Sequence, residues 1–481
     1  MSVQALLSTL PWSVVVQEDR EGPCPYTCHD GTVMENLPPF REVQATVSAG
    51  EGSSVRVYTW LPKEWNGRFL GTGSGGAAGY IAFWSLADGI RRGYAVAYSD
   101  LGTFPDLMAG HGNPEMWADF GHRANHMMAT VGKTLCLAHY GKSPDYSYYV
   151  GASTGGQQGL SLAQRYPEDF DGIVAGVPAN NRTCLHAYFV WNYQALHTED
   201  GAPMFTDDQI RRLQDRVTAL FVEEGLCGED TAFIPDPGKR GTEWIDTLLE
   251  KLGEEFSPAQ KEALRKIYEG PVNPRTGERI YTPYPYGAEA SPVGLDAACS
   301  LAAYRGLFYP FYWVFGPDYD LLRFDFDGDM DTYQNALAPY VNANSPDLSA
   351  FRERGGKLLI YSGTADPLVP YQDAVSYYER VVEAMGGLEQ TQEFCRFFVI
   401  PGMAHSTGGP GADRHPKVWL DGALKEPLDG VRAWREEGRP PDELRALREE
   451  DGKLVMNRPV PPYPERFTRD GMPKLAERFA Q

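Results

Sequence analysis

Ser153 lies in the pattern Gly-x-Ser-x-Gly, with Gly151 and Gly155 two residues before and after it. A short apolar stretch precedes this pattern and a helical stretch follows it, which is the strand–turn–helix order of a nucleophile elbow. Such a turn lifts the serine hydroxyl clear of the sheet, and the two glycines allow the close packing that the turn requires. A helix beginning at Thr154 would also direct its positive end at the site. The pattern therefore predicts a nucleophile at Ser153; the alternative is a glycine-rich turn without chemistry.

A serine nucleophile needs a general base and an orienting acid, and after such an elbow the acid and then the base follow along the chain. Asp366 comes directly after the buried-type strand 357–362, and His405 follows the next strand, 395–400. We expect both to reach the sheet edge that carries Ser153, where His405 would take the hydroxyl proton and Asp366 would fix its tautomer. Alone, Asp366 also fits an Asp-Pro turn and His405 an ordinary loop, but their joint order favours a triad.

The third requirement is an oxyanion hole, and a glycine-rich loop at 71–79 follows an early strand. In hydrolases with this elbow, such a loop supplies one backbone N–H and the residue after the nucleophile supplies another. We therefore predict the N–H groups of Gly75 and Thr154 for this role. The segment Gly71–Gly76 also spells G-x-G-x-x-G, and Asp100 closes the following strand, so a dinucleotide site is the alternative interpretation. That alternative requires a chain that opens with a βαβ unit.

The elements that must position these residues alternate between strand and helix. A helix is predicted from residue 117 to about 139, and strands are predicted at 55–61, 68–71, 94–100, 146–152 and 172–177. This alternation indicates an α/β fold with a parallel sheet and helices on both faces. It breaks near residue 178 and resumes near 348. We therefore predict an α/β-hydrolase core with a large lid domain inserted between core strands. The predicted parts are an irregular N-terminal arm (1–45), a first core part (46–184), the lid (185–347), a second core part (348–448) and a C-terminal tail (449–481).

The predicted lid is helical at 206–225 and 257–269 and rich in aromatic residues near 304–315. Rings at this density suit a clamp for a planar aromatic acyl group, although such runs also occur in cores. From this run, Tyr309, Phe311 and Tyr312 are the candidates for substrate binding.

Metal and cofactor signals are weak. His122 and His126 are four residues apart on a predicted helix, but no H-E-x-x-H pattern accompanies them, and a capped or solvated pair is favoured. The carboxylates of 325–331 alternate as in a calcium loop, but the glycine is misplaced and the twelfth-position Glu is missing, so a turn is expected. Cys24 and Cys28 lack a second cluster at zinc spacing. We expect neither a metal nor a cofactor.

With these motifs in place, the sequence resembles the tannase and feruloyl esterase family, which includes the enzyme that hydrolyses mono(hydroxyethyl) terephthalate. The resemblance runs from about Trp60 to Arg445 and is dense around the site. The segments that carry it are 61–70, 119–126, 164–175, 267–271, 347–351, 355–358, 401–405 and 408–410. It implies the nucleophile, acid and base roles for Ser153, Asp366 and His405. It also implies a serine carboxylesterase whose small-molecule substrates are esters of aromatic, phenolic acids, such as gallate, ferulate, caffeoyl or terephthalate monoesters. The alternatives are a dinucleotide-binding protein and a non-catalytic member of the fold.

The chain departs from the family pattern in two places. Most members have a cysteine before the nucleophile and another after the histidine, joined in a disulfide, whereas here these positions are Ala152 and Ser406. Packing and hydrogen bonds must then hold the catalytic loops. Many members also carry a calcium loop in the lid, but the corresponding segment 225–236 offers only Glu229, Asp230 and Asp236, and calcium is not expected.

Composition limits the partners and the compartment. A net charge of −21 argues against nucleic acid or an anionic membrane surface as partner, and no apolar run is long enough to span a membrane. The N-terminus lacks the basic start of a signal peptide. The cysteine count is odd, at seven, and the family's cysteine pair beside the triad is missing. These features and the N-terminal sequence together favour a reducing, cytoplasmic setting. The oligomeric state stays open.

Overall fold

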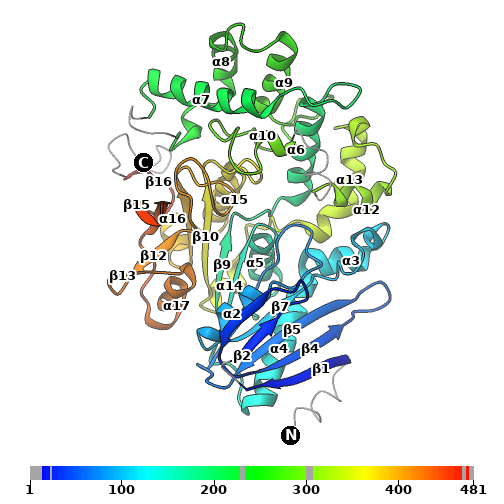
Figure 1. Cartoon of the computed structure of the whole chain (residues 1–481), viewed down its shortest axis with the longest axis vertical. Helices are drawn as coiled ribbons and strands as arrows, with labels where there is room; N and C mark the ends of the chain where they lie inside the picture. The colour runs from blue at the N-terminus through cyan, green and yellow to red at the C-terminus, as the bar shows by residue number, and fades with distance from the viewer. Residues whose placement is uncertain (1–12, 22–23, 228–232, 299–306, 468–472, 476–481) are drawn as a thin grey trace.

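The computed structural model describes residues 13–21, 24–227, 233–298, 307–467 and 473–475. A mixed sheet forms its centre (Figure 1), and the strands follow one another in space as β1 (Ser13–Arg20), β4 (Phe40–Val47), β5 (Val55–Pro62), β7 (Ala95–Ser99), β6 (Arg68–Thr72), β8 (Tyr146–Ala152), β9 (Gly172–Gly176), β10 (Lys357–Gly363) and β11 (Cys395–Ile400). From β7 to β11, neighbouring strands run parallel. The α/β architecture predicted from the alternation is confirmed.

The first part of the chain differs from the prediction of an irregular arm. β1 and β4 belong to the main sheet, and β1, β4, β5 and β7 pair antiparallel in that order. From Val43 to the end of β4, alternate residues (Val43, Ala45 and Val47) are buried, as expected of a strand with one covered face. β4 and β5 are joined by too few residues for the crossover that a parallel pair needs, so β5 pairs antiparallel rather than entering a wholly parallel sheet.

Helices cover both faces of the sheet. One face carries α2 (Phe83–Arg91) and α17 (Pro427–Glu437), and the other carries α4 (Ala124–Tyr140), α5 (Thr154–Arg165) and α15 (Tyr371–Ala384). Phe69 and Leu70, successive residues of β6, enter the two different hydrophobic clusters because strand side chains alternate between faces. The helix predicted from residue 117 to about 139 is present as α3 (Pro114–Ala118), a π-helical turn at Asp119–Arg123, and α4.

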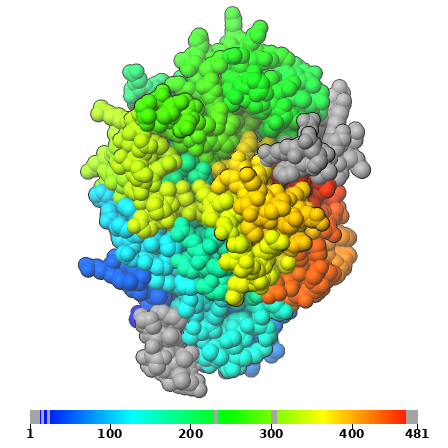
Figure 2. Space-filling view, turned by 180° about the vertical axis from the view of Figure 1, so that it is seen from behind, coloured from blue at the N-terminus to red at the C-terminus, as the bar shows by residue number. Residues whose placement is uncertain are grey.

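A helical insertion separates β9 from β10 and forms one end of the molecule, drawn in green in Figure 2. Its helices are α6 (Arg182–Ala195), α7 (Asp207–Glu223), α8 (Ile245–Lys251), α9 (Pro258–Glu269), α10 (Leu295–Ala298), α12 (Tyr309–Phe315) and α13 (Gly328–Val341). Both predicted lid helices are confirmed, and Thr206 and Ser257 begin them with capping boxes. The lid start predicted at residue 185 falls inside α6.

The C-terminal part is also more regular than the predicted tail. β14 (Leu444–Glu450) and β15 (Lys453–Val460) form a hairpin in a second sheet with β12 (Lys417–Leu420) and β13 (Ala423–Lys425). Charged residues are scattered along both strands of this hairpin, so its sequence lacks the apolar alternation that would have predicted strands. The remaining described strands and α-helices are β2 (Cys24–Thr27), β3 (Val33–Leu37), α14 (Ser349–Glu353), α16 (Leu388–Gln392), β16 (Glu465–Phe467) and β17 (Pro473–Leu475). None of the described helices combines the length and apolar character needed to cross a membrane.

Candidate active site

Ser153 occupies a strained turn between β8 and α5. Its φ of 61° and ψ of −118° are unusual for any residue other than glycine. The turn is tight enough that a Cβ on Gly151 would lie 2.5 Å from the carbonyl oxygen of Gly155. Ser153 N–H donates to the carbonyl of Gly176 at 3.0 Å, which ties the turn to the neighbouring strand β9. The backbone therefore has the geometry of a nucleophile elbow.

Asp366 and His405 follow the ends of β10 and β11, as their positions in the sequence predict. His405 Nδ1 donates to Asp366 Oδ2 at 2.8 Å. The other carboxylate oxygen of Asp366 accepts from the backbone N–H groups of Leu368 and Val369, each at 2.9 Å, and the side chain is fully buried. Since Nδ1 carries the proton, Nε2 is the basic nitrogen of His405.

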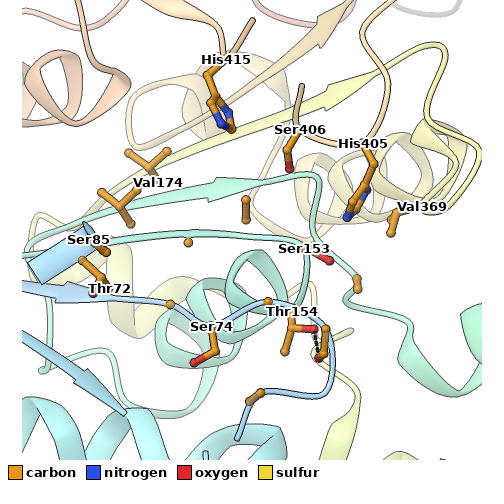
Figure 3. Close-up of a pocket in the computed structure, with 18 of the residues that line it drawn as sticks. Thr72, Ser74, Ser85, Ser153, Thr154, Val174, Val369, His405, Ser406 and His415 are labelled. Atoms are coloured by element: carbon orange, nitrogen blue, oxygen red, sulfur yellow. Dashed lines mark hydrogen bonds between the residues drawn. The ribbon is translucent and has the colours of Figure 1, made fainter. Parts of the chain in front are cut away.

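Ser153 and His405 line the same cavity, which has a volume of about 1080 Å³. The imidazole of His405 points toward Ser153 across this cavity (Figure 3). The structure thus brings the three predicted residues together: Asp366 is hydrogen-bonded to His405, and His405 faces Ser153 over open space. This arrangement allows the imidazole to take a proton from the serine. The cavity gives substrate or water access to both residues.

The glycine loop after β6 forms the cavity wall opposite His405. Gly75, Gly76 and Thr154 all line the cavity, and Thr154 Oγ1 donates to the carbonyl of Gly76 at 2.7 Å, which holds the loop against the start of α5. In this structure the N–H of Gly75 donates to the hydroxyl of Tyr80 at 3.2 Å. An oxyanion bound by the Gly75 N–H would take the place of the Tyr80 hydroxyl as the acceptor of this hydrogen bond. Tyr80 is a site residue that sequence reasoning missed.

Arg182, at the start of α6, is a second residue that sequence reasoning missed. It lines the cavity but is almost completely buried. Its guanidinium donates to Thr154 Oγ1 at 2.8 Å and to the Tyr309 hydroxyl at 3.0 Å, and it approaches His186 Nε2 at 3.3 Å. Burial and the nearby Arg182 lower the pKa of His186 well below its usual value, so the imidazole is neutral. Within the described chain, the hydrogen-bond partners of this cation are therefore all uncharged.

The aromatic candidates of the insertion separate in the structure. Tyr309 lines the cavity, but Phe311 and Tyr312 do not. Phe311 stacks on Tyr333 with ring centroids 4.3 Å apart, inside the helical insertion. Successive side chains of a helix point in different directions, so α12 presents one ring of this run to the cavity and packs the others. Among the described residues of the insertion, the cavity is also lined by Arg182, Leu185, His186, Phe189 and Leu307.

The weaker metal and cofactor signals have separate structural partners. His122 Nδ1 pairs with the Tyr166 hydroxyl and His126 Nδ1 with Asp169, each at 2.8 Å. In 325–331, Asp325 accepts the N–H of Gly328 at the start of α13, the turn that we expected. No group of three or more potential metal ligands occurs among the described residues. Of the calcium-loop candidates, Glu229 and Asp230 lie outside the described residues.

The dinucleotide alternative is not supported by the structure around its motif. The chain opens with antiparallel strands rather than a βαβ unit. Asp100 is fully buried and accepts from the backbone N–H and the guanidinium of Arg56 at 3.0 and 2.6 Å, so its carboxylate is already engaged. The same glycine loop instead packs against β8 and α5, where a Cβ on Gly73 would lie 2.7 Å from the Cα of Gly155.

Comparison with known proteins agrees with this geometry. The chain matches the family described as tannase and feruloyl esterase over residues 42–301 and 311–480. It is 32% identical to an uncharacterized esterase of Xanthomonas campestris pv. campestris, covering 92% of this chain and 83% of that protein. It is 31% identical to the probable feruloyl esterase B-2 of Aspergillus flavus, covering 83% and 78%. The crystal structure of feruloyl esterase B from Aspergillus oryzae superposes with a TM-score of 0.83 at 25% identity, covering 96% of this chain and 95% of that one. Tannin acyl hydrolase from Aspergillus niger, at 19% identity and a TM-score of 0.73 over 97% and 92%, shares the fold.

Proposed function

The chain belongs to the tannase and feruloyl esterase family, and from this membership we propose that it hydrolyses esters of aromatic, phenolic acids through an acyl-enzyme on Ser153. It is a carboxylic ester hydrolase, as its relatives are named esterases, feruloyl esterases and tannin acyl hydrolase. The observation that carries the assignment of Ser153 is its strained turn on the wall of a cavity that also exposes His405, whose Nδ1 is bonded to Asp366.

The reaction would proceed in two halves. Ser153 Oγ attacks the ester carbonyl while His405 Nε2 takes its proton, and Asp366 stabilises the imidazolium. The N–H groups of Thr154 and Gly75 would hold the oxyanion, supported by the positive end of α5. Collapse of this intermediate breaks the ester bond, and His405 gives its proton to the leaving alcohol. Water then loses a proton to His405 and attacks the acyl-enzyme, which releases the aromatic acid and restores Ser153.

The acyl group is proposed to lie under the helical insertion. Leu185, Phe189, Leu307 and Tyr309 provide apolar and aromatic surface on that side of the cavity, which suits a planar ring. The hydroxyl of Tyr309 provides a polar group for a phenolic acid. Gallate, ferulate, caffeoyl and terephthalate monoesters all fit this description as substrates.

The test compares Ser153→Ala and Asp366→Asn with the native protein on methyl gallate, methyl ferulate and p-nitrophenyl acetate. We expect Ser153→Ala to abolish turnover, and Asp366→Asn to lower kcat by about 10⁴-fold because the imidazole loses the partner that fixes its tautomer. A fluorophosphonate reagent should label Ser153 in the native protein, as peptide mass spectrometry would show. The matched control is Ser161→Ala, which removes a buried hydroxyl from the same helix α5 and should leave turnover unchanged.

Full activity in a folded Ser153→Ala variant would assign the nucleophile elsewhere. Failure of the native protein to hydrolyse any member of an aromatic ester panel would instead favour the non-catalytic member of the fold. Circular dichroism and thermal unfolding of each variant separate loss of chemistry from loss of structure.

A further inference from the structure

The cavity beside Ser153 extends well beyond the space under the helical insertion. Its volume of about 1080 Å³ slightly exceeds the range of roughly 300–1,000 Å³ for drug-sized ligands, whereas a single aromatic acid is much smaller. Apart from the glycine loop and the loops around Ser153 and His405, the lining residues come from two separate places: the insertion, and the sheet face that carries α2 and α17. The second place is not used by the reaction described above.

We call this second part the α2–α17 groove. The sheet forms its floor through Leu70, Val150 and Val174, while Ser85 lies on the side of α2 and Leu428 on the side of α17. Arg92, which follows α2, donates to Asp429 of α17 at 2.7 Å and bridges the two helices. Trp84, His415 and Lys417 also line the groove.

The groove connects with the reacting serine because two small residues, Ala152 and Ser406, lie where the groove meets the catalytic residues. Val150 and Ala152 are two residues apart on β8, so their side chains point to the same sheet face. Ala152 and Ser406 line the cavity directly beside Ser153 and His405. In Figure 3, Ser406 lies between His405 and His415, and Ser85, Thr72 and Val174 lie on the side away from Val369 and Thr154. A ligand at Ser153 can therefore reach into the groove without displacing a large side chain.

The chemistry of the groove suits an uncharged ring with polar substituents. Its charged groups are largely paired, since Lys417 forms an ion pair with Glu426, and Arg92 with Asp429. Burial and the nearby Lys417 lower the pKa of His415, so this ring is neutral at neutral pH and can donate or accept a hydrogen bond. Trp84 is 70% exposed at the rim, a position where its flat face can stack on a ligand ring.

Building on the proposed function, we propose that the α2–α17 groove is a second substrate subsite, which binds a ring-bearing alcohol portion of the ester while the acyl ring lies under the insertion. The leaving oxygen must lie next to His405, because His405 protonates it. The next residue, Ser406, lines the entrance of the groove, so a bulky alcohol leaves the reacting centre on this side. The enzyme should accordingly prefer esters that are large on both sides of the scissile bond.

The test uses matched methyl and 2-phenylethyl esters of caffeic and gallic acids. Burying the second ring should raise kcat/KM for the 2-phenylethyl ester by about tenfold or more over the methyl ester. Ser85→Trp fills the groove from α2 and should remove that preference, lowering kcat/KM for the 2-phenylethyl ester by about tenfold while the methyl ester changes less than about twofold. Ser85→Ala is the matched control and should keep the preference.

A second measurement is independent of turnover. In the Ser153→Ala background, calorimetry should give tighter binding of the 2-phenylethyl ester than of the methyl ester, and addition of Ser85→Trp should cancel the difference. Thermal unfolding checks that Ser85→Trp folds.

The outcomes separate the subsite from the proposed function. Hydrolysis of the methyl esters without any preference for the larger alcohol would overturn the subsite and leave the esterase assignment intact. The same holds if Ser85→Trp lowers both esters equally in a folded protein. Ser85→Trp could instead lower kcat/KM selectively for a methyl ester with an enlarged acyl group. That result would show that the groove binds the acyl side of the ester, and it would overturn the assignment to the alcohol. Absence of hydrolysis of every ester would contradict the proposed function itself.

Discussion

At the scale of single residues, the site depends on backbone strain that its surroundings must offset. A non-glycine residue held at the positive φ of Ser153 costs about 1–3 kcal/mol. The hydrogen bond from Ser153 N–H to Gly176 and the bond from Gln157 N–H to the Ser153 carbonyl hold the turn from both sides. Glycine at 151 and 155 permits the close approach that makes those bonds possible. The elements on either side of Ser153 therefore hold its half-buried side chain on the cavity wall.

Arg182 supports a prediction at the same scale. Its guanidinium holds Thr154 Oγ1, which in turn holds the carbonyl of Gly76. We expect Arg182→Met to lower kcat by about 10- to 100-fold with a smaller change in KM, because the loop that carries the proposed oxyanion donor loses its tether. Steady-state kinetics on an aromatic methyl ester would measure both constants.

The control for Arg182→Met is Arg165→Met, which removes an exposed arginine from α5. Since the described partners of Arg182 are uncharged, its removal leaves no orphaned carboxylate, and the melting temperature should fall only modestly. Unchanged kcat in Arg182→Met would show that the loop keeps its geometry without this contact.

At the scale of elements, the helical insertion has its own buried polar groups. Glu289 is completely buried, and its Oε1 accepts from the Tyr268 hydroxyl at 2.6 Å and from the Gly287 N–H at 3.0 Å. Its other oxygen, Oε2, has no hydrogen-bond partner among the described residues. Burial raises the pKa of Glu289 to about 7. The insertion is therefore built around a carboxyl group that stays protonated below neutral pH.

This protonation predicts a pH-dependent stability. Because the folded pKa of Glu289 lies above its unfolded value, its contribution is fully present below about pH 4.5 and is lost as the pH rises to about 7. The loss is on the order of 3 kcal/mol. Glu289→Gln copies the neutral acid at every pH, so its melting temperature should exceed that of the native protein at pH 8 and differ little at pH 5.

The exposed Glu278 of the same insertion provides a matched control. Glu278→Gln should alter the melting temperature equally at the two pH values, or leave it unchanged at both. A Glu289→Gln variant less stable than the native protein at pH 8 would show that the ionised carboxylate is tolerated in the fold.

At the scale of the whole molecule, packing holds the core, and five cysteines whose side chains the structure describes are free thiols. Cys28, Cys136, Cys184, Cys227 and Cys395 are free and buried. Burial raises the pKa of Cys184 to about 11 and that of Cys136 to about 12, which disfavours the reactive thiolate. With Ala152 and Ser406 beside the triad, no disulfide can join the two catalytic loops. The reducing, cytoplasmic setting expected from the sequence stays a prediction.

We therefore expect dithiothreitol to leave both esterase activity and melting temperature unchanged. Activity on an aromatic methyl ester and a thermal scan, each with and without reductant, would measure this. Thiol titration under denaturing conditions should count all seven cysteines as free. Marked inactivation by reductant, together with a mapped disulfide, would contradict both the reduced state and the proposed compartment.

Local sequence patterns alone predicted much of the candidate site and of the elements that position it. Gly151-x-Ser153-x-Gly155 between a strand and a helix is a local signal, and so are the strands that end before Asp366 and His405. The sheet then brings the ends of β8, β10 and β11 to one edge, because parallel strands align their carboxyl ends. The local sequence likewise predicted α7 and α9.

Only the tertiary structure decided which side chains share a space. Arg182 and Tyr80 reach the site through contacts with distant segments, and no local pattern distinguishes them. Phe311 and Tyr312 belong to the same aromatic run as Tyr309 but turn away from the cavity, since the rotation of α12 against its neighbours selects the ring that faces it. The N-terminal strands and the C-terminal hairpin were missed because pairing across chain segments, rather than local polarity, determines which residues become strands.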